Sequence, residues 1–169
     1  MTPGSGKPRI LLTGALGCLG SAVRQVAGSD HELVCMDIGP SDDPSVRQGD
    51  FTDAARMRDL LAGCDAVIHT ASLHGGHRLT HTPTQFAEAN VGGLVTMLDL
   101  CRELGVRRFV FSSTIEILVG RDWTASGMAV LDEGAAPRPD WIYPLTKLLG
   151  EQVGLYYFST LVVKSCSKW

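Results

Sequence analysis

Short runs of consecutive apolar residues alternate along the chain with segments in which apolar residues recur every three or four positions. The runs are typical of strands buried on both faces, and the periodic segments of helices that bury one face. They predict strands at residues 10–12, 33–36, 46–50, 66–69 and 108–111. Because such alternation indicates a parallel sheet with helices on both faces, we predict a Rossmann-like, doubly wound α/β fold of about five to six strands.

Three helices are predicted between these strands. The first is expected to bury a face made of Leu19, Ala22, Val23 and Val26. The second begins at Thr52 or Asp53, either of which can cap it. The third spans residues 84–104, ends at Gly105, and is expected to turn inward Val91, Leu94, Val95, Leu98 and Cys101.

Length and composition narrow the functional classes. The 169 residues are 44% hydrophobic, which suits one domain with a proper core, and the net charge of −3 favours neither nucleic acid nor an anionic membrane as partner. No apolar run approaches the ~18 residues that cross a bilayer. Five scattered cysteines without a CxxC pair indicate small buried hydrophobes in a reducing compartment, so we expect a cytoplasmic, soluble protein.

The pattern of apolar and polar residues also divides the chain into three regions. Residues 1–8 are expected to form a flexible arm, residues 9–158 a nucleotide-binding domain, and residues 159–169 an atypical tail with a sixth strand at 161–163. A long loop is expected between residues 120 and 140, where prolines and glycines gather. A loop of that length beside a site is more often functional than idle.

A glycine-rich turn joins the first strand to the first helix. TGALGCLG places Gly14, Gly17 and Gly20 at the spacing GxxGxxG. Glycine allows a tight turn, close approach of the backbone to a pyrophosphate, and close helix–strand contact, while the helix N-terminus offers free N–H groups. A turn that binds nothing is the alternative, but the strand–turn–helix context favours a dinucleotide site.

Carboxylates follow the next two strands. Asp37 ends the second strand, where a carboxylate can accept hydrogen bonds from the ribose hydroxyls and repel a 2′-phosphate, which favours NAD over NADP. A turn or cap aspartate is the alternative. Asp50 and Phe51 follow the third strand and could bracket the adenine, although Asp50 could equally be a structural residue.

A tyrosine and a lysine share one face of a predicted helix near the end of the chain. Tyr143 and Lys147 are four residues apart, and FVFSST places Thr114 at the carboxyl edge of the sheet. A tyrosine is a poor base at neutral pH, so a neighbouring ammonium is expected to lower its pKa. Together these side chains predict an acid–base site.

The ordered set TGALGCLG, GDFTD, DAVIHTAS, NVGG, FVFSST and YPLTK resembles the extended short-chain dehydrogenase/reductases, the NAD-dependent epimerase/dehydratases. The resemblance implies Tyr143 as the acid–base residue, Lys147 as a ligand of the nicotinamide ribose, and Thr114 as the catalytic hydroxyl. It implies cofactor contacts at Gly14, Gly17, Cys18, Leu19, Gly20, Asp37, Asp50, Phe51, Ala71, Ser72, Asn90, Tyr143 and Lys147. For Asn90, bracing of a buried turn is an equal alternative.

The chain also departs from that family. Ile115 stands where the dehydratases carry an acid, so water elimination is disfavoured, and Glu116 is interpreted as a surface or loop carboxylate. The expected chemistry is hydride transfer at a secondary alcohol or ketone of a small molecule such as a sugar nucleotide, with a homodimer left open. The family's substrate domain is largely missing, so the alternative is a non-catalytic NAD-binding module or inactive fragment.

Histidines gather after the fourth strand. His69, His74, His77 and His81 surround SLHGGHRLTH, but neither a carboxylate nor a cysteine joins them, so no metal site is predicted. A polar loop over the cleft is the better interpretation, with His74 or His77 able to contact substrate phosphate or sugar. Trp123 and Trp141 are expected to pack the long loop.

Overall fold

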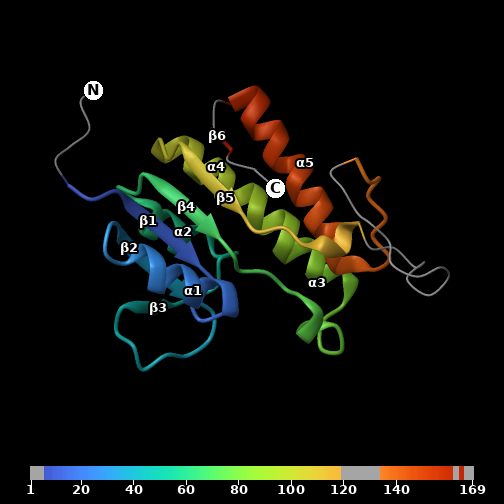
Figure 1. Cartoon of the computed structure of the whole chain (residues 1–169), viewed down its shortest axis with the longest axis horizontal. Coiled ribbons are helices and arrows are strands. Elements are labelled where there is room, and N and C mark those ends of the chain that lie inside the picture. The colour runs from blue at the N-terminus through green and yellow to red at the C-terminus, as the bar shows by residue number, and fades with distance from the viewer. Residues whose placement is uncertain (1–5, 119–133, 162–163, 166–169) are drawn as a thin grey trace.

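The sheet is parallel and six-stranded. The computed structural model describes residues 6–118, 134–161 and 164–165, and the strand order is β3-β2-β1-β4-β5-β6 (Figure 1). The order reverses between β1 and β4, which creates the switch point at which ligands bind in open α/β sheets. The strands are β1 (Arg9–Thr13), β2 (Glu32–Asp37), β3 (Val46–Gln48), β4 (Ala66–His69), β5 (Arg108–Phe111) and β6 (Lys164–Ser165).

Helices cover both faces of this sheet, as predicted. The described helices are α1 (Cys18–Ala27), α2 (Ala54–Leu61), η1 (Gly75–His77), α3 (Pro83–Ala87), η2 (Glu88–Gly93), α4 (Leu94–Leu104), η3 (Ile115–Ile117) and α5 (Ile142–Leu161). The larger core cluster joins the sheet to α2, α4 and α5, while a smaller one around Leu12, Ala15, Cys35 and Val46 includes Val23 of α1. The doubly wound Rossmann-like fold is confirmed.

The buried face of α1 differs from the prediction. Val26 is 82% exposed and Leu19 51% exposed. Gly20 is the buried residue of this helix, and Val23 packs against the smaller core. Gly20 has no side chain, so α1 approaches the sheet most closely at this residue. The buried face therefore includes Gly20 and Val23 and leaves out the apolar Leu19 and Val26. The predicted face was therefore wrong except at Val23.

The helix predicted over residues 84–104 is three successive helical segments. It starts at Pro83, one residue after the cap Thr82, and its middle part, η2, is π-helical. Gly105 ends it in the left-handed conformation with φ of 74°, as predicted. Of the residues expected to face inward, Leu94, Leu98 and Cys101 are buried, whereas Val91 and Val95 are half-buried.

The expected position of the sixth strand is corrected. Leu161 is the last residue of α5, and the sixth strand is Lys164–Ser165, which pairs in parallel with β5 at Arg108 and Phe109. Val162, Val163, the tail at 166–169, Trp123 and most of the loop at 120–140 lie outside the described residues. Residues 134–140 form no helix or strand.

The cysteine expectation holds for three residues. Cys35, Cys64 and Cys101 are buried, and burial raises the pKa of the Cys101 thiol to about 12. Cys18, at the start of α1, is exposed instead. Among the described helices, none combines the length and the apolarity that crossing a membrane requires.

Candidate active site

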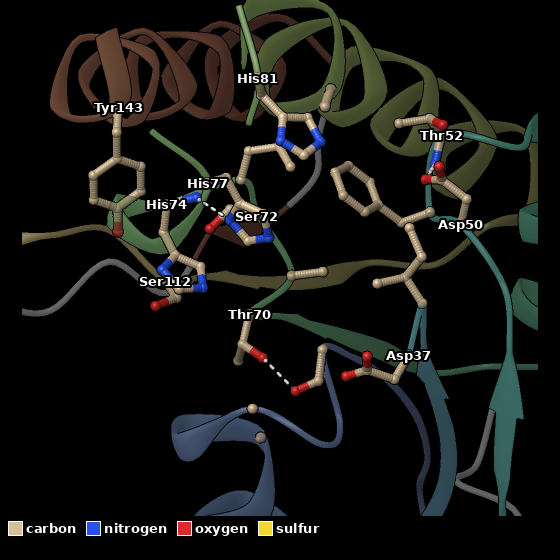
Figure 2. A pocket seen from close by; sticks show the side chains of 18 of the residues that line it. Asp37, Asp50, Thr52, Thr70, Ser72, His74, His77, His81, Ser112 and Tyr143 are labelled. Atoms are coloured by element: carbon tan, nitrogen blue, oxygen red, sulfur yellow. Dashed lines mark hydrogen bonds between the residues drawn. The ribbon is translucent and has the colours of Figure 1, made fainter. Parts of the chain in front are cut away.

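A cleft of about 920 Å³ opens at the carboxyl ends of β1, β2, β4 and β5 (Figure 2). Its position follows from the topology, because the connections after these strands meet at the switch point of the sheet. Thr114 and Asn90 are the predicted site residues that do not line it. Those that do are Gly14, Gly17, Cys18, Leu19, Gly20, Asp37, Asp50, Phe51, Ala71, Ser72, Tyr143 and Lys147.

Two glycines of the turn are required by space. Gly14 has φ of 73°, and a Cβ added there would lie 2.7 Å from the backbone nitrogen of Ala71. A Cβ on Gly20 would lie 2.0 Å from the carbonyl oxygen of Gly14. Gly14 can therefore lie against the segment after β4, and Gly20 of α1 can lie against Gly14, only because neither residue has a side chain.

Gly20→Ala is expected to lower the free energy of unfolding by about 1–3 kcal/mol, because its methyl group must displace backbone atoms. Chemical denaturation measures this. The matched control is Gly154→Ala in α5, where an added Cβ meets no atom within 4 Å. That change should stabilise the chain by about 0.5–1 kcal/mol through helix propensity. Equal effects from both substitutions would contradict the steric explanation.

The N-terminus of α1 faces the cleft without a side-chain cap. Gly17 is the N-cap residue, and no side chain hydrogen-bonds the first turn. Gly17, Cys18 and Leu19 line the cleft. The first N–H groups of a helix have no partner within the helix and carry partial positive charge, so this end of α1 suits a phosphate group.

The carboxylate of Asp37 is fixed by the backbone around it. Its two oxygens accept hydrogen bonds from the N–H groups of Leu16 and Gly39, each at 2.9 Å. A carboxylate has about four acceptor sites, so further hydrogen bonds from a ligand remain feasible. Asp37 thus ties the glycine turn to the end of β2 while it lines the cleft.

Asp50 and Phe51 line the same cleft as Asp37, and Figure 2 shows Asp37 and Asp50 at the same end of it. Asp50 accepts a hydrogen bond from the N–H of Thr52 at 2.9 Å, and the cap of α2 is Asp53, one of the two predicted cap residues. Phe51 packs edge-on against His69, with ring centres 5.0 Å apart. Both residues therefore have a structural contact as well as a place in the cleft wall.

Lys147 is buried within α5 and faces the end of β5. It is 2% exposed, and its Nζ donates to the carbonyl of Ser112 at 2.8 Å and lies 4.7 Å from the ring centre of Phe111. Within the described ranges, none of the ion pairs involves this ammonium. Burial alone lowers the pKa of Lys147 from 10.5 to about 8.

Tyr143 is half-buried on the same helix, with its ring centre 5.9 Å from the Lys147 ammonium. Burial raises its pKa; a hydrogen bond with Thr114 opposes this shift, and the charge of Glu116 adds to it. The structure therefore contradicts the prediction that Lys147 lowers the pKa of Tyr143. The physical reason is that the phenol is desolvated, while the ammonium is directed to the Ser112 carbonyl.

A model of the NAD dependent epimerase/dehydratase family matches residues 10–167. The chain belongs to this family. A uronate dehydrogenase of Pseudomonas putida is 30% identical over 165 residues, which cover 94% of this chain and 59% of the relative.

Solved structures agree with this family membership. A short-chain dehydrogenase/reductase superfamily protein from Agrobacterium tumefaciens, solved with bound NAD, has a TM-score of 0.80 at 26% identity over 93% of this chain and 47% of its own. MoeE5 in complex with UDP-glucose and NAD has a TM-score of 0.76 at 29% identity, covering 95% of this chain and 52% of its own. The chain thus spans about half the length of these relatives.

Thr114 and Glu116 lie beside Tyr143. The Thr114 hydroxyl also accepts from the N–H of Glu116 at 3.3 Å and caps η3. Glu116 accepts from the indole N–H of Trp141 at 2.9 Å, and the Trp141 and Tyr143 ring centres are 5.5 Å apart. Glu116 was predicted as a surface or loop carboxylate. It lies in η3 after β5, half-buried next to the phenol whose pKa it raises.

Asn90 lies behind the cleft, 3% exposed. Its amide binds both backbone groups of Leu73, accepting from the N–H at 2.8 Å and donating to the carbonyl at 2.9 Å. It also donates to the hydroxyl of Thr146 at 3.0 Å. Asn90 therefore connects the segment after β4 to α5 at Thr146, which directly precedes Lys147 and lies three residues after Tyr143.

Sequence reasoning missed part of the cleft wall. Thr70 holds the glycine turn, because its hydroxyl lies 2.7 Å from the Thr13 carbonyl oxygen. Its position directly after a buried strand was the signal that could have identified it. The polar loop with His74 and His77 was predicted over the cleft; the other cleft residues absent from the predicted site are Ile38, Thr52, Thr70, Leu73, His81, Gln85, Glu88, Ala89 and Ser112.

The four histidines do not form one group. His69 is 1% exposed in β4, hydrogen-bonded through Nδ1 to Thr13 at 2.7 Å, and burial followed by the charge of Lys147 lowers its pKa to about 3. His74, His77 and His81 instead line the cleft (Figure 2). Across the parts of the chain that are described, no cluster of His, Cys, Asp and Glu could hold a metal ion.

Proposed function

We propose that this chain binds NAD in the cleft and supports hydride transfer at a secondary alcohol or ketone of a sugar or sugar nucleotide. The observation that carries the proposal is the convergence of the glycine turn, the uncapped N-terminus of α1, Asp37 and the Tyr143–Lys147 pair on one cleft. The sugar class is supported by the relatives, among them uronate dehydrogenases and MoeE5 with UDP-glucose and NAD.

In this proposal the pyrophosphate lies at Gly14, Gly17 and Gly20, with Cys18 and Leu19 beside it. Asp37 accepts hydrogen bonds from the adenosine ribose, and its charge disfavours the 2′-phosphate of NADP. Asp50 and Phe51 flank the adenine, and Ala71 and Ser72 line the cofactor after β4. The missing Cβ atoms at Gly14 and Gly20 and the free helix terminus support this fit.

NAD supplies a hydride acceptor or donor when it is bound. Tyr143 is the proposed proton carrier, and its raised pKa keeps the phenol protonated at neutral pH, ready to donate to a developing alkoxide. Thr114, which hydrogen-bonds this phenol, orients the substrate oxygen. Lys147 binds the nicotinamide ribose, and Asn90 keeps α5 in register with the segment after β4.

Calorimetric titration with NAD and a nicotinamide-absorbance assay with uronates and sugar nucleotides test the proposal together. Binding with turnover is the expected result. Binding without turnover would instead support the second candidate, a non-catalytic NAD-binding module. Absence of NAD binding would defeat both.

Asp37→Ala is expected to weaken NAD at least about tenfold, because a charged hydrogen-bond acceptor is lost from the ribose site. The affinity for NADP should fall less, since the substitution also removes the negative charge that repels the 2′-phosphate of NADP. Titration of the variant with both nucleotides measures this. Asp42→Ala, an exposed aspartate in the loop after β2, is the control. Unchanged NAD affinity in Asp37→Ala would refute the assigned role.

A further inference from the structure

The segment after β4 forms a short histidine-bearing turn on the wall of the cleft. His74 caps η1, His77 ends it, and the two rings meet edge to face with centres 4.7 Å apart. Figure 2 shows His74 and His77 in the same cleft as Ser72, Ser112 and Tyr143. The turn therefore lies near the proposed reacting end, away from Asp37 and Asp50.

Hydrogen bonds to the backbone define which ring nitrogens carry protons. Nδ1 of His77 accepts from the N–H of His74 at 3.1 Å, and Nδ1 of His74 accepts from the N–H of Gly76 at 3.4 Å. Because an amide N–H can only donate, each Nδ1 must be the unprotonated nitrogen of a neutral ring. Each Nε2 therefore bears a proton and is a hydrogen-bond donor.

His81 contacts a side chain and not a backbone N–H. Its Nδ1 lies 2.9 Å from the hydroxyl of Thr80, which is also 3.2 Å from the carbonyl oxygen of His77. A hydroxyl can donate or accept, so this contact does not define the tautomer of His81. The backbone therefore defines hydrogen-bond donors at His74 and His77 only.

The surrounding charges fit an anion better than a cation. Lys147 lines the same cleft, and Arg78, the residue after His77, has its guanidinium 5.2 Å from the centre of the Trp141 ring. The carboxylates that line the cleft are Asp37 and Asp50, at its other end, and Glu88, which is exposed to solvent. A metal ion would need unprotonated Nε2 atoms, whereas His74 and His77 present N–H groups.

We propose that His74 and His77 form a site for an oxyanion of the substrate, a carboxylate or phosphate group, which accepts hydrogen bonds from their Nε2–H groups. This inference rests on the proposed function in that it places the substrate in the same cleft. It adds that the substrate is anionic near its reacting end. The two donors are prearranged by the backbone, so little ordering is required when the anion binds.

Histidine-selective NMR tests this proposal with a matched set of hexoses: glucuronate, glucose 6-phosphate and glucose, each with and without NAD. The expected result is that one or both anions shift the ring resonances of His74 and His77, and that neutral glucose does not. The stronger of the two anions identifies the carboxylate or the phosphate as the group bound. His31, which directly precedes β2 at the amino-terminal edge of the sheet and lies outside this cleft, reports nonspecific binding.

Glutamine variants separate binding from folding. His77→Gln keeps an acceptor for the N–H of His74, as glutamine does at this position of a capping box, so the turn should persist. His77→Gln and His74→Gln should each weaken the anion at least about fivefold, and His81→Gln should not.

Three results would overturn the proposal: no shift with either anion, equal shifts with glucose, or equal shifts at His31. NAD binding without an anion response would defeat this inference and leave the cofactor proposal standing. An anion response without NAD binding would do the reverse.

Discussion

Tyr143→Phe is expected to lower turnover by about 10³-fold while the Kd for NAD changes little. Positioned acid–base groups contribute roughly 10²–10⁴-fold to rate, and phenylalanine removes the proton but keeps the ring. The ring matters to packing, because it lies 5.5 Å from the centre of the Trp141 ring. The loss should therefore appear in kcat, with the fold and the cofactor site preserved.

Steady-state rates and NAD calorimetry on the same preparation measure both parts of this expectation. Tyr156→Phe is the matched control, since Tyr156 is on the same helix and 58% exposed. It should leave kcat unchanged. A tenfold or greater loss of NAD affinity in Tyr143→Phe would show that the phenol holds the cofactor, and a wild-type kcat would exclude it as the proton carrier.

Lys147→Met is expected to stabilise the fold by about 2 kcal/mol at pH 7 while abolishing function. The pKa shift from 10.5 to about 8 corresponds to a cost of about 3 kcal/mol for keeping this ammonium buried. Loss of the hydrogen bond to the Ser112 carbonyl offsets about 1 kcal/mol of the gain. Methionine fills a similar volume without a charge to desolvate.

The size of this stabilisation depends on pH. Below about 8 the lysine is protonated in both states and the full cost is present; between about 8 and 10.5 the unfolded chain binds more protons, so the wild type gains stability as pH rises. The advantage of Lys147→Met should therefore shrink over that interval. Denaturation of both proteins at several pH values measures it, and a variant less stable than wild type at pH 7 would contradict the argument.

Patterns that report on local sequence predicted much of the fold. Ile10, Leu11 and Leu12 are buried in β1, and the strands predicted at 66–69 and 108–111 have the same bounds in the structure. The glycine turn, Asp37 and the residues after β4 were placed at one cleft because parallel strands deliver their carboxyl ends to one edge. Local periodicity and topology sufficed for these features.

The failures concern properties that depend on three-dimensional packing and geometry, which residue spacing does not reveal. The face of α1 was misassigned because the fit of Gly20 against Gly14 outweighs the apolarity of Leu19 and Val26. The direction of the Tyr143 pKa shift depends on burial, which a four-residue spacing to Lys147 does not reveal. Likewise, the hydrogen donors of the histidine turn follow from backbone geometry alone.

The π-helical segment η2 changes the direction in which side chains point before and after it along one continuous helical run. Asn90, inside it, is aimed at Leu73 and Thr146, while Leu94 and Leu98 beyond it are aimed at the core. An α-helix turns by about 100° per residue, so the extra residue of a π turn resets the phase between these two tasks. A deletion of one residue within Glu88–Gly93 would rotate one set away from its partners. In this helix the number of residues therefore matters as much as their identity. A homologue with one residue fewer would need other contacts in place of either the Asn90 hydrogen bonds or the core packing of Leu94 and Leu98.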